Sequence, residues 1–452
     1  MYKKSSEEKY ELKYFGTDGF RGEYGKELTD THAEAIGRFL GVYYGDGGAE
    51  ILIGRDTRRS SPLLESALVR GITSVGGSAF RLGVCPTPAV SFLTKHGGAD
   101  ASVMITASHN PAGDNGIKLF GKNGEKLPDD ITALCEEYID SHREVEEKKG
   151  MIVNVPHVIF LWRRWLTSSV GSLKGVKIGL DCANGATYDV APRIFKELGA
   201  EVYTIGCEPN GENINLGVGS TRPEALSKMV KEHSLDMGFA FDGDGDRCIA
   251  VDHQGEIIDG DCEMFILARA MKEKGGLQGD TVVCTVMSNG GFIRSLEKIG
   301  IKCITTAVGD RFVAEKMKEE GASLGGEQSG HLIFEGGGGD GIYTALKIAQ
   351  EVVRSGKGLR ELGDGITRFP QLSRSIRVKD KVMVMNDKEL LNTVTSLSEE
   401  MGASGRILLR PSGTEGLIRL MVEHEKQEKC KQYLELIGNM IEERWSSDSD
   451  GN

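Results

Sequence analysis

The chain has 452 residues, of which 39% are hydrophobic and 27% are charged, and its formal net charge is −12. This length exceeds one ordinary hydrophobic core and predicts three or four domains, and the composition is typical of a globular protein rather than a disordered one. The acidic balance disfavours broad electrostatic binding to nucleic acid, so phosphate groups would have to be bound in local pockets.

Targeting signals and disulfides are also not expected from the sequence. No run of about 18 apolar residues occurs, which argues against a membrane span, and the charged start MYKKSSEEKYELK lacks the apolar core of a signal peptide. The nine cysteines are scattered, odd in number and never spaced as C-x-x-C, as expected for reduced thiols. A cytoplasmic location is therefore predicted, with a flexible tail over the first 13 residues.

Three stretches of the chain repeat one order of elements: an apolar strand, a segment with helical periodicity, a glycine and a second strand. They begin at 49–56, 176–185 and 280–291. Each is typical of a βαβ unit, which favours parallel strand pairing with a right-handed crossover. We therefore predict three similar α/β domains with mixed, mostly parallel sheets, at 1–153, 154–255 and 256–368.

The last part of the chain, 374–452, has a different order and predicts a smaller α+β domain. It reads as a strand near 375–380, a helix at 390–402, a strand over 405–423 and a closing helix, with a frayed end at 446–452. Charged residues at 144–150 and Gly- and Pro-bearing residues at 363–373 are the expected linkers.

Ser108 lies in the stretch SVMITASHNPAGDNGIK, 102–118, where a predicted strand ends at Ile105 and Asn110-Pro111 favours a turn. A serine in such a loop can be a nucleophile or a helix cap, and the spacing leaves both open. A G-x-S-x-G pattern at 321–325 lies between a helix and a strand, the reverse of the strand-to-helix elbow that a serine hydrolase needs. A serine hydrolase is therefore excluded.

The turn DGDGDR, 242–247, places three carboxylates at every second position with glycines between them. Their mutual repulsion is costly unless a cation neutralises it. An EF-hand is excluded, because Arg247 and His253 stand where its loop needs glycine and glutamate. An open, all-oxygen site suits Mg²⁺, with a solvated Asp-Gly turn as the alternative. The preceding strand and the following arginine favour the metal.

Three further glycine-rich segments carry polar side chains. GGGGDG, 336–341, matches a dinucleotide-binding pattern, but no clear strand follows its helix, so this reading is disfavoured. GGEQSGH, 325–331, is either a reader of sugar hydroxyls or an ordinary turn. RPSGTEGLIR, 410–419, combines arginines, hydroxyls and a glycine amide in a compact anion-binding nest.

Five motifs in order, FGTDGFRG, TASHNP, DGDGDR, GEQSGH and RPSGTE, resemble the α-D-phosphohexomutase superfamily. The resemblance extends from about Tyr14 to Glu423 and is closest to the members that act on glucosamine phosphates. It implies four domains around a central cleft. It also implies the conversion of glucosamine 6-phosphate to glucosamine 1-phosphate, on the route to UDP-N-acetylglucosamine and the cell wall.

Carried over by position, the resemblance assigns the phosphoryl-carrying role to Ser108. One Mg²⁺ per subunit would be held by a phosphate oxygen on that serine and by three carboxylates, those of Asp242, Asp244 and Asp246. Arg21 and Arg247 would add positive charge at the transferring group. The base for the sugar hydroxyl would be His109 or Lys118, and the lysine would serve only if its pKa were lowered.

The same resemblance assigns the remaining substrate contacts. The sugar hydroxyls would be held by the loop residues Glu327, Ser329 and His331. The phosphate that is not reacting would be held by Arg410, Ser412, Gly413, Thr414 and Arg419. Glucosamine or glucose 1,6-bisphosphate would be the activator, and an enzyme without phosphate on the serine would be inactive.

Some alternatives stay open at this point. The same chemistry on mannose or glucose phosphates is the nearest one, although Gln328-Ser329 resembles the amino-sugar enzymes. A regulator that binds sugar phosphates without turnover is the alternative outside the enzymes.

Two features depart from the family pattern. Gly416 stands where the family usually has proline, and the basic, aromatic segment 157–166 indicates either a surface contact or ordinary helix packing. A homodimer is possible.

Overall fold

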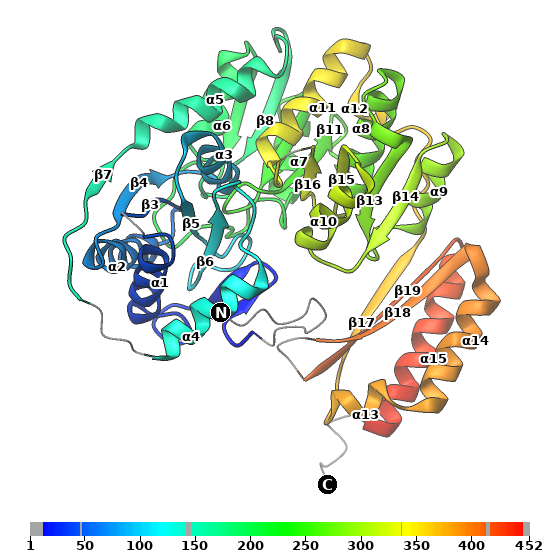
Figure 1. The fold of residues 1–452 in the computed structure, drawn as a ribbon. Coiled ribbons are helices and arrows are strands. Elements are labelled where there is room, and N and C mark those ends of the chain that lie inside the picture. Colours follow the sequence, from blue (N-terminus) through cyan, green and yellow to red (C-terminus); the bar gives the residue numbers. More distant parts are fainter. Residues whose placement is uncertain (1–11, 46–47, 142–145, 336, 413–415, 446–452) are drawn as a thin grey trace. The chain divides into compact units, whose positions relative to one another are not determined.

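The computed structural model describes residues 12–45, 48–141, 146–335, 337–412 and 416–445 (Figure 1). The chain divides into two compact units. The first runs to Met287 and includes Ile301–Asp364, and the second consists of Ser288–Gly300 and the residues from Gly365 onward. The two predicted frayed ends lie largely or wholly outside the described residues.

The first domain is built on a seven-stranded sheet of order β1-β2-β6-β5-β3-β4-β7. Its strands are β1 Phe15–Gly16, β2 Gly19–Glu23, β3 Glu50–Arg55, β4 Ser78–Val84, β5 Ala101–Ile105, β6 Asp114–Gly121 and β7 Ile152–Asn154, and its helices are α1 Asp30–Tyr43, α2 Ser61–Ser74, α3 Thr87–Gly97 and α4 Asp129–Ser141. Strand β3 pairs in parallel with β4 and β5, whereas β6 runs antiparallel to β5. Helices α1 and α2 approach each other closely because glycines lie at the crossing. A Cβ on Gly37 would lie 2.3 Å from a carbonyl oxygen of α2, and a Cβ on Gly71 would lie 2.1 Å from a carbonyl oxygen of α1.

The second domain has a five-stranded sheet of order β12-β11-β10-β8-β9. Its elements are β8 Lys177–Asp181, α6 Val190–Glu197, β9 Glu201–Ile205, α7 Glu224–Glu232, β10 Met237–Phe241, β11 Cys248–Asp252 and β12 Ile257–Ile258. Strand β8 pairs in parallel with β9 and β10, and β10 turns back antiparallel into β11. Both strands of this hairpin are buried throughout, so the position of the turn that joins them, residues 242–247, is fixed by the core.

The third domain has a four-stranded sheet of order β14-β13-β15-β16. Its elements are α8 Gly260–Glu273, β13 Thr281–Thr285, β14 Lys302–Thr306, α10 Asp310–Glu320, β15 Leu324–Gly326, β16 Leu332–Phe334, α11 Gly341–Ser355 and α12 Leu359–Leu362. The pairs β13–β14 and β13–β15 are parallel, and β15–β16 is antiparallel. The three predicted parallel pairs are thus β3–β4, β8–β9 and β13–β14, which confirms the predicted α/β class.

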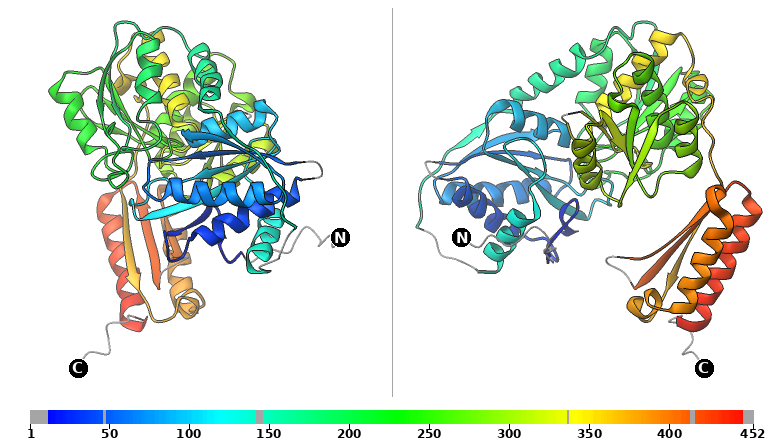
Figure 2. Two further views of the ribbon diagram at one scale, coloured as in Figure 1. Left: turned by 90° about the vertical axis from the view of Figure 1, so that its left-hand side faces the viewer. Right: turned by 45° about the vertical axis from the view of Figure 1, so that its right-hand side comes forward.

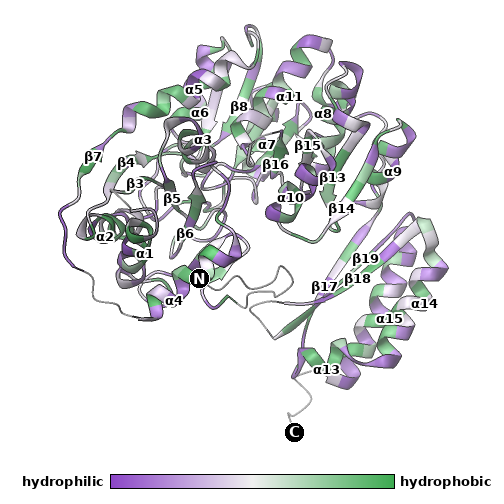
Figure 3. Ribbon diagram, in the orientation of Figure 1, coloured by the Kyte–Doolittle hydropathy of each residue, from purple (hydrophilic) through white to green (hydrophobic). Residues whose placement is uncertain are grey.

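The basic, aromatic segment 157–166 forms most of α5, Ile159–Ser168, and its buried side is explained by helix packing. Trp162 is fully buried and donates from Nε1 to Asp340 Oδ2 at 3.1 Å. The Trp165 ring lies 5.2 Å from that of Phe92 on α3 and 5.0 Å from that of Tyr343 on α11. The helix therefore joins the first and third domains through aromatic contacts. The hydropathy colouring shows both apolar and polar stretches along this helix (Figure 3).

The second unit contains a three-stranded antiparallel sheet of order β17-β19-β18. Its elements are α9 Gly290–Lys298, β17 Gln371–Arg377, α13 Lys381–Met385, α14 Lys388–Met401, β18 Gly405–Pro411, β19 Leu417–His424 and α15 Gln427–Trp445. Helices α14 and α15 lie together on one face of this sheet (Figure 2). Their contact is apolar, with Leu390, Leu420 and Ile437 all buried in one cluster.

One predicted element of this unit is wrong. The stretch 405–423 was predicted as a single strand, but it forms the hairpin β18–β19, in which Ser412 N donates to Leu417 O at 2.8 Å. A polar, glycine-bearing stretch between two apolar runs is typical of the connection between paired strands. Within this unit, α9 is bonded to β19, since Glu423 Oε1 accepts from Gly290 N at 2.8 Å.

Two expectations about the chain as a whole concern membranes and thiols. Within the described ranges, no helix is both long and apolar enough to pass through a bilayer. The nine cysteines are free thiols, seven of them buried.

Candidate functional site

The carboxylate turn connects β10 to β11, and burial of both strands presents its side chains together. Asp242, Asp244 and Asp246 are buried, and each offers one oxygen within 4.8 Å of the others. Gly245 is required at this turn, because its φ is +73° and a Cβ would lie 2.5 Å from Thr187 Cγ2.

This triad fits a divalent cation. Asp244 Oδ1 and Asp246 Oδ1 are buried, and the described part of the chain places no hydrogen-bond donor on either. Burial, followed by the charges of Asp246 and Asp244, raises the pKa of Asp242 well above its usual range. Crowded carboxylates with oxygens left over are the donor set that Mg²⁺ prefers.

Ser108 follows β5 and reaches the triad from the first domain. Its Oγ donates to Asp242 Oδ2 at 2.5 Å, and its backbone N donates to Thr106 Oγ1 at 2.9 Å. The backbone of Ser108 has a φ of +51°, in the left-handed region that few residues other than glycine adopt. The structure thus brings the predicted serine and the predicted metal ligands into direct contact.

His109, one of the two predicted bases, lies next to the serine hydroxyl. Its Nδ1 lies 3.3 Å from Ser108 Oγ. Burial, followed by the charges of Arg247 and Arg21, lowers the pKa of His109 to about 4, so the imidazole is neutral at neutral pH. A neutral ring nitrogen close to the serine can accept a proton.

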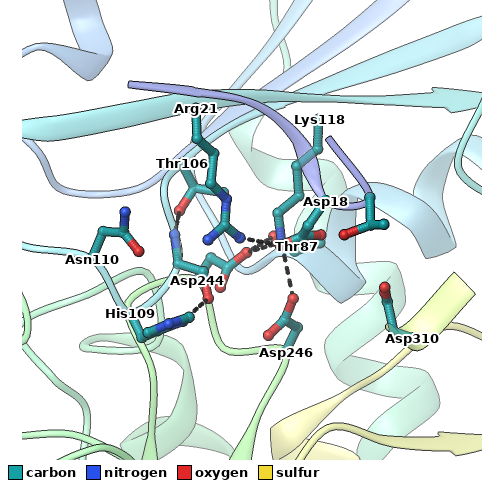
Figure 4. A network of polar contacts seen from close by, with 12 residues as sticks. Asp18, Arg21, Thr87, Thr106, His109, Asn110, Lys118, Asp244, Asp246 and Asp310 are labelled. Carbon is teal, nitrogen blue, oxygen red and sulfur yellow. Dashed lines mark hydrogen bonds and ion pairs between the residues drawn. The ribbon is translucent and has the colours of Figure 1, made fainter. Parts of the chain in front are cut away.

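Lys118, on β6, is surrounded by carboxylates (Figure 4). Its Nζ lies 2.9 Å from Asp244 Oδ2, 3.0 Å from Asp246 Oδ2 and 3.3 Å from Asp18 Oδ2. Burial alone lowers the pKa of the ammonium, but the three carboxylates outweigh it and raise this pKa well above its usual value. In this arrangement Lys118 is a buried partner of the three carboxylates, and its role as a base stays a prediction.

Of the two predicted arginines, Arg247 contacts the triad, and Arg21 contacts Asp18, which shares Lys118 with the triad. Arg21 is paired with Asp18, and Arg247 N donates to Asp242 Oδ1 at 3.2 Å. The Nε of each arginine is buried, and we find no acceptor for it in the described ranges. Unused N–H groups beside the serine suit an incoming anion.

The glycine-rich loop of the third domain packs against the carboxylate turn. Gly330 O accepts from Cys248 N at 3.0 Å, directly after the turn. Glu327 Oε1 accepts from Gly309 N at 3.2 Å, and Ser329 Oγ lies 3.5 Å from Glu327 Oε2. The predicted sugar-binding residues thus lie beside the triad.

His331, the third predicted residue of that loop, contacts acids of the site. Its Nδ1 lies 3.6 Å from Asp246 Oδ1, and its Nε2 lies 3.5 Å from Asp310 Oδ2. Burial lowers the pKa of His331, but Asp246 and then Asp310 raise it to about 9 overall. In this arrangement His331 is a charge partner of Asp246.

The predicted phosphate-binding residues belong to the second unit. Arg410 on β18 stands directly opposite Arg419 on β19, and Ser412, directly after β18, is buried. Like charges directly opposed on neighbouring strands are unfavourable, and a bound anion would relieve them. Gly413 and Thr414 lie outside the described residues.

Sequence reasoning missed several residues of the site. Thr87 donates from Oγ1 to Asp244 Oδ2 at 2.6 Å. Lys126 joins Asp18, at 2.6 Å, to Asp310, at 2.7 Å, and so links the first domain to the third. Thr87 could have been found, because it follows a predicted parallel strand, and the carboxyl ends of such strands gather polar residues. No residue near Lys126 in the sequence indicates that Asp18 and Asp310 are its partners.

A cavity of about 750 Å³ adjoins this site between the first and third domains. Lys118, Asp246 and His331 form part of its wall, together with Lys126 and Asp310. The polar centre of the site is therefore accessible from this side.

A serine bonded to one of three clustered aspartates, with a glycine-rich polar loop beside them on three α/β domains, is typical of the phosphohexomutase class. Sequence models for the four phosphoglucomutase/phosphomannomutase domains match in order: α/β/α domain I at 12–146, domain II at 164–255, domain III at 259–369 and the C-terminal domain at 375–438. The chain belongs to the phosphoglucomutase/phosphomannomutase family.

Relatives and solved structures agree with this membership. The chain is 48% identical to the phosphoglucosamine mutase of Geobacillus kaustophilus (strain HTA426) and 47% identical to that of Bacillus subtilis (strain 168), over 95% of this chain and 98% of each relative. A phosphoglucomutase/phosphomannomutase family protein from Burkholderia thailandensis has the same fold, with a TM-score of 0.80 at 24% identity over 94% of this chain and 97% of that one. Aspergillus fumigatus N-acetylphosphoglucosamine mutase, solved with GlcNAc-6P and magnesium, has a TM-score of 0.69 at 16% identity, with 96% of each chain covered.

Proposed function

We propose that the protein interconverts glucosamine 6-phosphate and glucosamine 1-phosphate through a phosphorylated Ser108. The observation that carries this proposal is the contact between Ser108 Oγ and the carboxylate triad at 2.5 Å. Relatives named phosphoglucosamine mutase, at 47 to 48% identity over nearly the whole chain, support the choice of sugar.

The cycle has two phosphoryl transfers. In the first, the free sugar hydroxyl bonds to phosphorus and gives its proton to a base, while the bond between phosphorus and Ser108 Oγ breaks and Oγ takes up a proton, which gives the 1,6-bisphosphate. The bisphosphate turns in the site. In the second, Ser108 Oγ gives up its proton and bonds to the other phosphate, the sugar oxygen leaves with a proton, and the enzyme is again phosphorylated. Such transfers depend chiefly on positioning and on neutralisation of charge.

The triad would hold Mg²⁺, which when bound withdraws electron density from the phosphoryl oxygens. The buried oxygen left over on Asp244 supports this assignment. Arg21 and Arg247 each keep an Nε–H for the phosphoryl group, beside the serine. Together these groups would neutralise the charge of the transferring phosphate.

For the proton of the sugar hydroxyl, geometry favours His109 over Lys118. His109 Nδ1 lies 3.3 Å from Ser108 Oγ, whereas the Lys118 amine is held by three carboxylates. A base must be within hydrogen-bond reach of the proton that it takes.

The sugar and the distal phosphate would be bound by the loops that the sequence indicated. Glu327 and Ser329 lie beside the triad with oxygens for sugar hydroxyls. The opposed arginines Arg410 and Arg419, with Ser412, form the phosphate site, and Gly413 and Thr414 complete it in this proposal. Glucosamine or glucose 1,6-bisphosphate would activate dephosphorylated enzyme, and a homodimer in the cytoplasm belongs to the same proposal.

The second candidate is the same reaction on mannose or glucose phosphates, because the matching domains are named for phosphoglucomutase and phosphomannomutase. The test is turnover of glucosamine, mannose and glucose 6-phosphates side by side, with Mg²⁺ and catalytic bisphosphate. We expect the glucosamine substrate to be the fastest. Equal rates on the three sugars would refute the assignment of the sugar, and no turnover of any would refute the proposed function.

A further inference from the structure

The backbone of the serine loop converges on one buried guanidinium. Arg58 has no exposed surface, and its NH2 donates to Ser108 O at 3.0 Å and to Asn110 O at 2.9 Å. Its NH1 donates to Asp114 O at 2.9 Å and also to Pro111 O. One side chain therefore holds four carbonyl groups of the loop that carries the serine.

The guanidinium is itself held in place by Asp56, directly after β3. Asp56 Oδ2 accepts from Arg58 Nε at 2.8 Å, and Oδ1 accepts from Arg58 N at 3.0 Å and from Ser61 Oγ at 2.7 Å. Asp56 N donates in turn to Ile105 O, at the end of β5. The planar arginine is thus fixed to the central strands of the sheet.

A second residue, from the second domain, binds two of the same carbonyls. Asn215 Nδ2 donates to Ser108 O at 2.9 Å and to Asn110 O at 3.1 Å. The carboxylate turn also packs closely on this point, since a Cβ on Gly243 would lie 2.5 Å from Ser108 O. The Ser108 carbonyl is therefore held by residues of both domains that form the site.

This arrangement has a consequence for the direction of the serine hydroxyl. With a φ of +51°, the backbone of Ser108 is in a conformation that persists only where the surroundings impose it. The same conformation directs Oγ to Asp242 at 2.5 Å. We propose that Arg58 and Asn215 are positioning residues, a clamp on the backbone of the Ser108 loop that aligns the serine for phosphoryl transfer.

The clamp rests on the proposed function of Ser108, but it predicts an effect of its own. Neither residue needs to touch the sugar phosphate, so its loss lowers the rate of transfer rather than the affinity for substrate. A displacement of about 1 Å in such a site costs on the order of 100-fold in rate. A merely structural role would instead lower the melting temperature and leave kcat unchanged.

Two variants and one matched control test the clamp. Arg58→Lys keeps a cation for Asp56 but lacks the fork that reaches four carbonyls. Asn215→Gly removes the amide and tolerates the native φ of +59°. The control is Asn184→Gly, because Asn184 also has a positive φ, of +49°, and its amide bonds to Glu208 N and Asn213 O within the second domain.

We expect kcat to fall by about 100-fold in Arg58→Lys and about 10-fold in Asn215→Gly, with KM for glucosamine 6-phosphate within about twofold of wild type. Asn184→Gly retains wild-type kcat. A wild-type kcat in Asn215→Gly, or an equal loss in Asn184→Gly, overturns the clamp, and Asn215→Gly serves this purpose even where Arg58→Lys does not fold.

A second measurement separates failure of the clamp from failure of the proposed function. Amide hydrogen exchange over 105–115 is measured by mass spectrometry on the full chain, in wild type and in the Asn215→Gly and Asn184→Gly variants. The clamp predicts faster exchange in Asn215→Gly alone, whether or not the wild type turns over the sugar phosphate. Unchanged exchange in that variant overturns the clamp. Wild-type protein without phosphate on Ser108 and without turnover overturns the proposed function instead.

Discussion

The hydroxyl of Ser108 donates to Asp242 at 2.5 Å across 134 positions of sequence. The serine comes from the end of a strand in the first domain, and the aspartate comes from a hairpin turn in the second. The reacting hydroxyl and the carboxylates exist as one site only while these two domains stay in contact. Changes on either side of that contact therefore have distinct, measurable effects.

Replacement of Ser108 by alanine removes the oxygen that carries the phosphoryl group. We expect activity on glucosamine 6-phosphate to fall by about 10⁴-fold or more, as for other lost nucleophiles, with an unchanged melting temperature. The control is Ser66→Ala, because Ser66 is exposed on α2 and its hydroxyl bonds only to its own helix, at Pro62 O among the described residues. Near-normal turnover in Ser108→Ala would refute a phosphoserine cycle.

Removal of metal tests the triad independently of activity. Because Asp242, Asp244 and Asp246 crowd three carboxyl groups into one site and a single ammonium, that of Lys118, contacts only two of them, we expect Mg²⁺ to raise the melting temperature and EDTA to reverse the rise. At 100 times its Kd, a ligand of the native state adds about 2.7 kcal/mol to the free energy of unfolding. Asp244→Asn should lose most of this gain, whereas Asp189→Asn, at an exposed position on the same domain, should keep it. Equal stabilisation of both variants would contradict the assignment.

Replacement of Lys118 by methionine leaves three buried or partly buried carboxylates without their shared cation. Loss of one member of such a buried network costs about 3 to 5 kcal/mol in the free energy of unfolding. We expect that loss in urea titrations with EDTA, and a smaller loss with Mg²⁺, because the metal neutralises two of the same acids. A loss that does not depend on Mg²⁺ would show that lysine and metal act at separate places.

Much of this site follows from local sequence. The triad, the serine turn and the glycine-rich loop each stand at the end of a buried strand, and alternating apolar runs predict those strands. The three parallel pairs β3–β4, β8–β9 and β13–β14 follow from the same patterns.

The rest depends on contacts that no local pattern encodes. Nothing near Lys118 indicates that three acids from two remote turns surround it, so its raised pKa could not be predicted. The clamp by Arg58 consists of bonds to backbone carbonyls, which every residue has and no side-chain pattern reveals. The hairpin at 405–424 was missed because two apolar runs flank its turn without a change of period.

Helix α5 offers a test of packing between the first and third domains. Trp162 is fully buried and bonded to Asp340, whereas Trp165, three residues on, is 39% exposed. We expect Trp162→Ala to lower the free energy of unfolding by about 3 to 5 kcal/mol and Trp165→Ala to cost clearly less. Urea denaturation of the two variants measures the difference. Equal costs would mean that stacking on Phe92 and Tyr343, rather than burial, dominates this contact.

The partner of Trp162 also predicts a dependence of stability on pH. Burial raises the pKa of Asp340 from its usual 3.8 to about 7. Because the folded-state pKa lies above the unfolded one, the folded protein holds the proton more tightly. The contribution to stability is complete below about pH 4 and is lost as pH rises toward 7. Asp340→Asn keeps an oxygen for the Tyr343 amide and cannot ionise.

Between pH 4 and 7 the free energy of unfolding of the wild type should therefore fall relative to that of Asp340→Asn, by about 2 to 4 kcal/mol. Urea titrations of both proteins at four or five pH values in this range give the difference directly. The contributions of the other titrating groups are the same in both proteins and cancel in this difference. Asp189→Asn, at an exposed acid, should run parallel to the wild type. A constant difference between wild type and Asp340→Asn across the range would mean that the carboxyl stays ionised in the folded protein, with the indole N–H of Trp162 and the helix amides outweighing its burial.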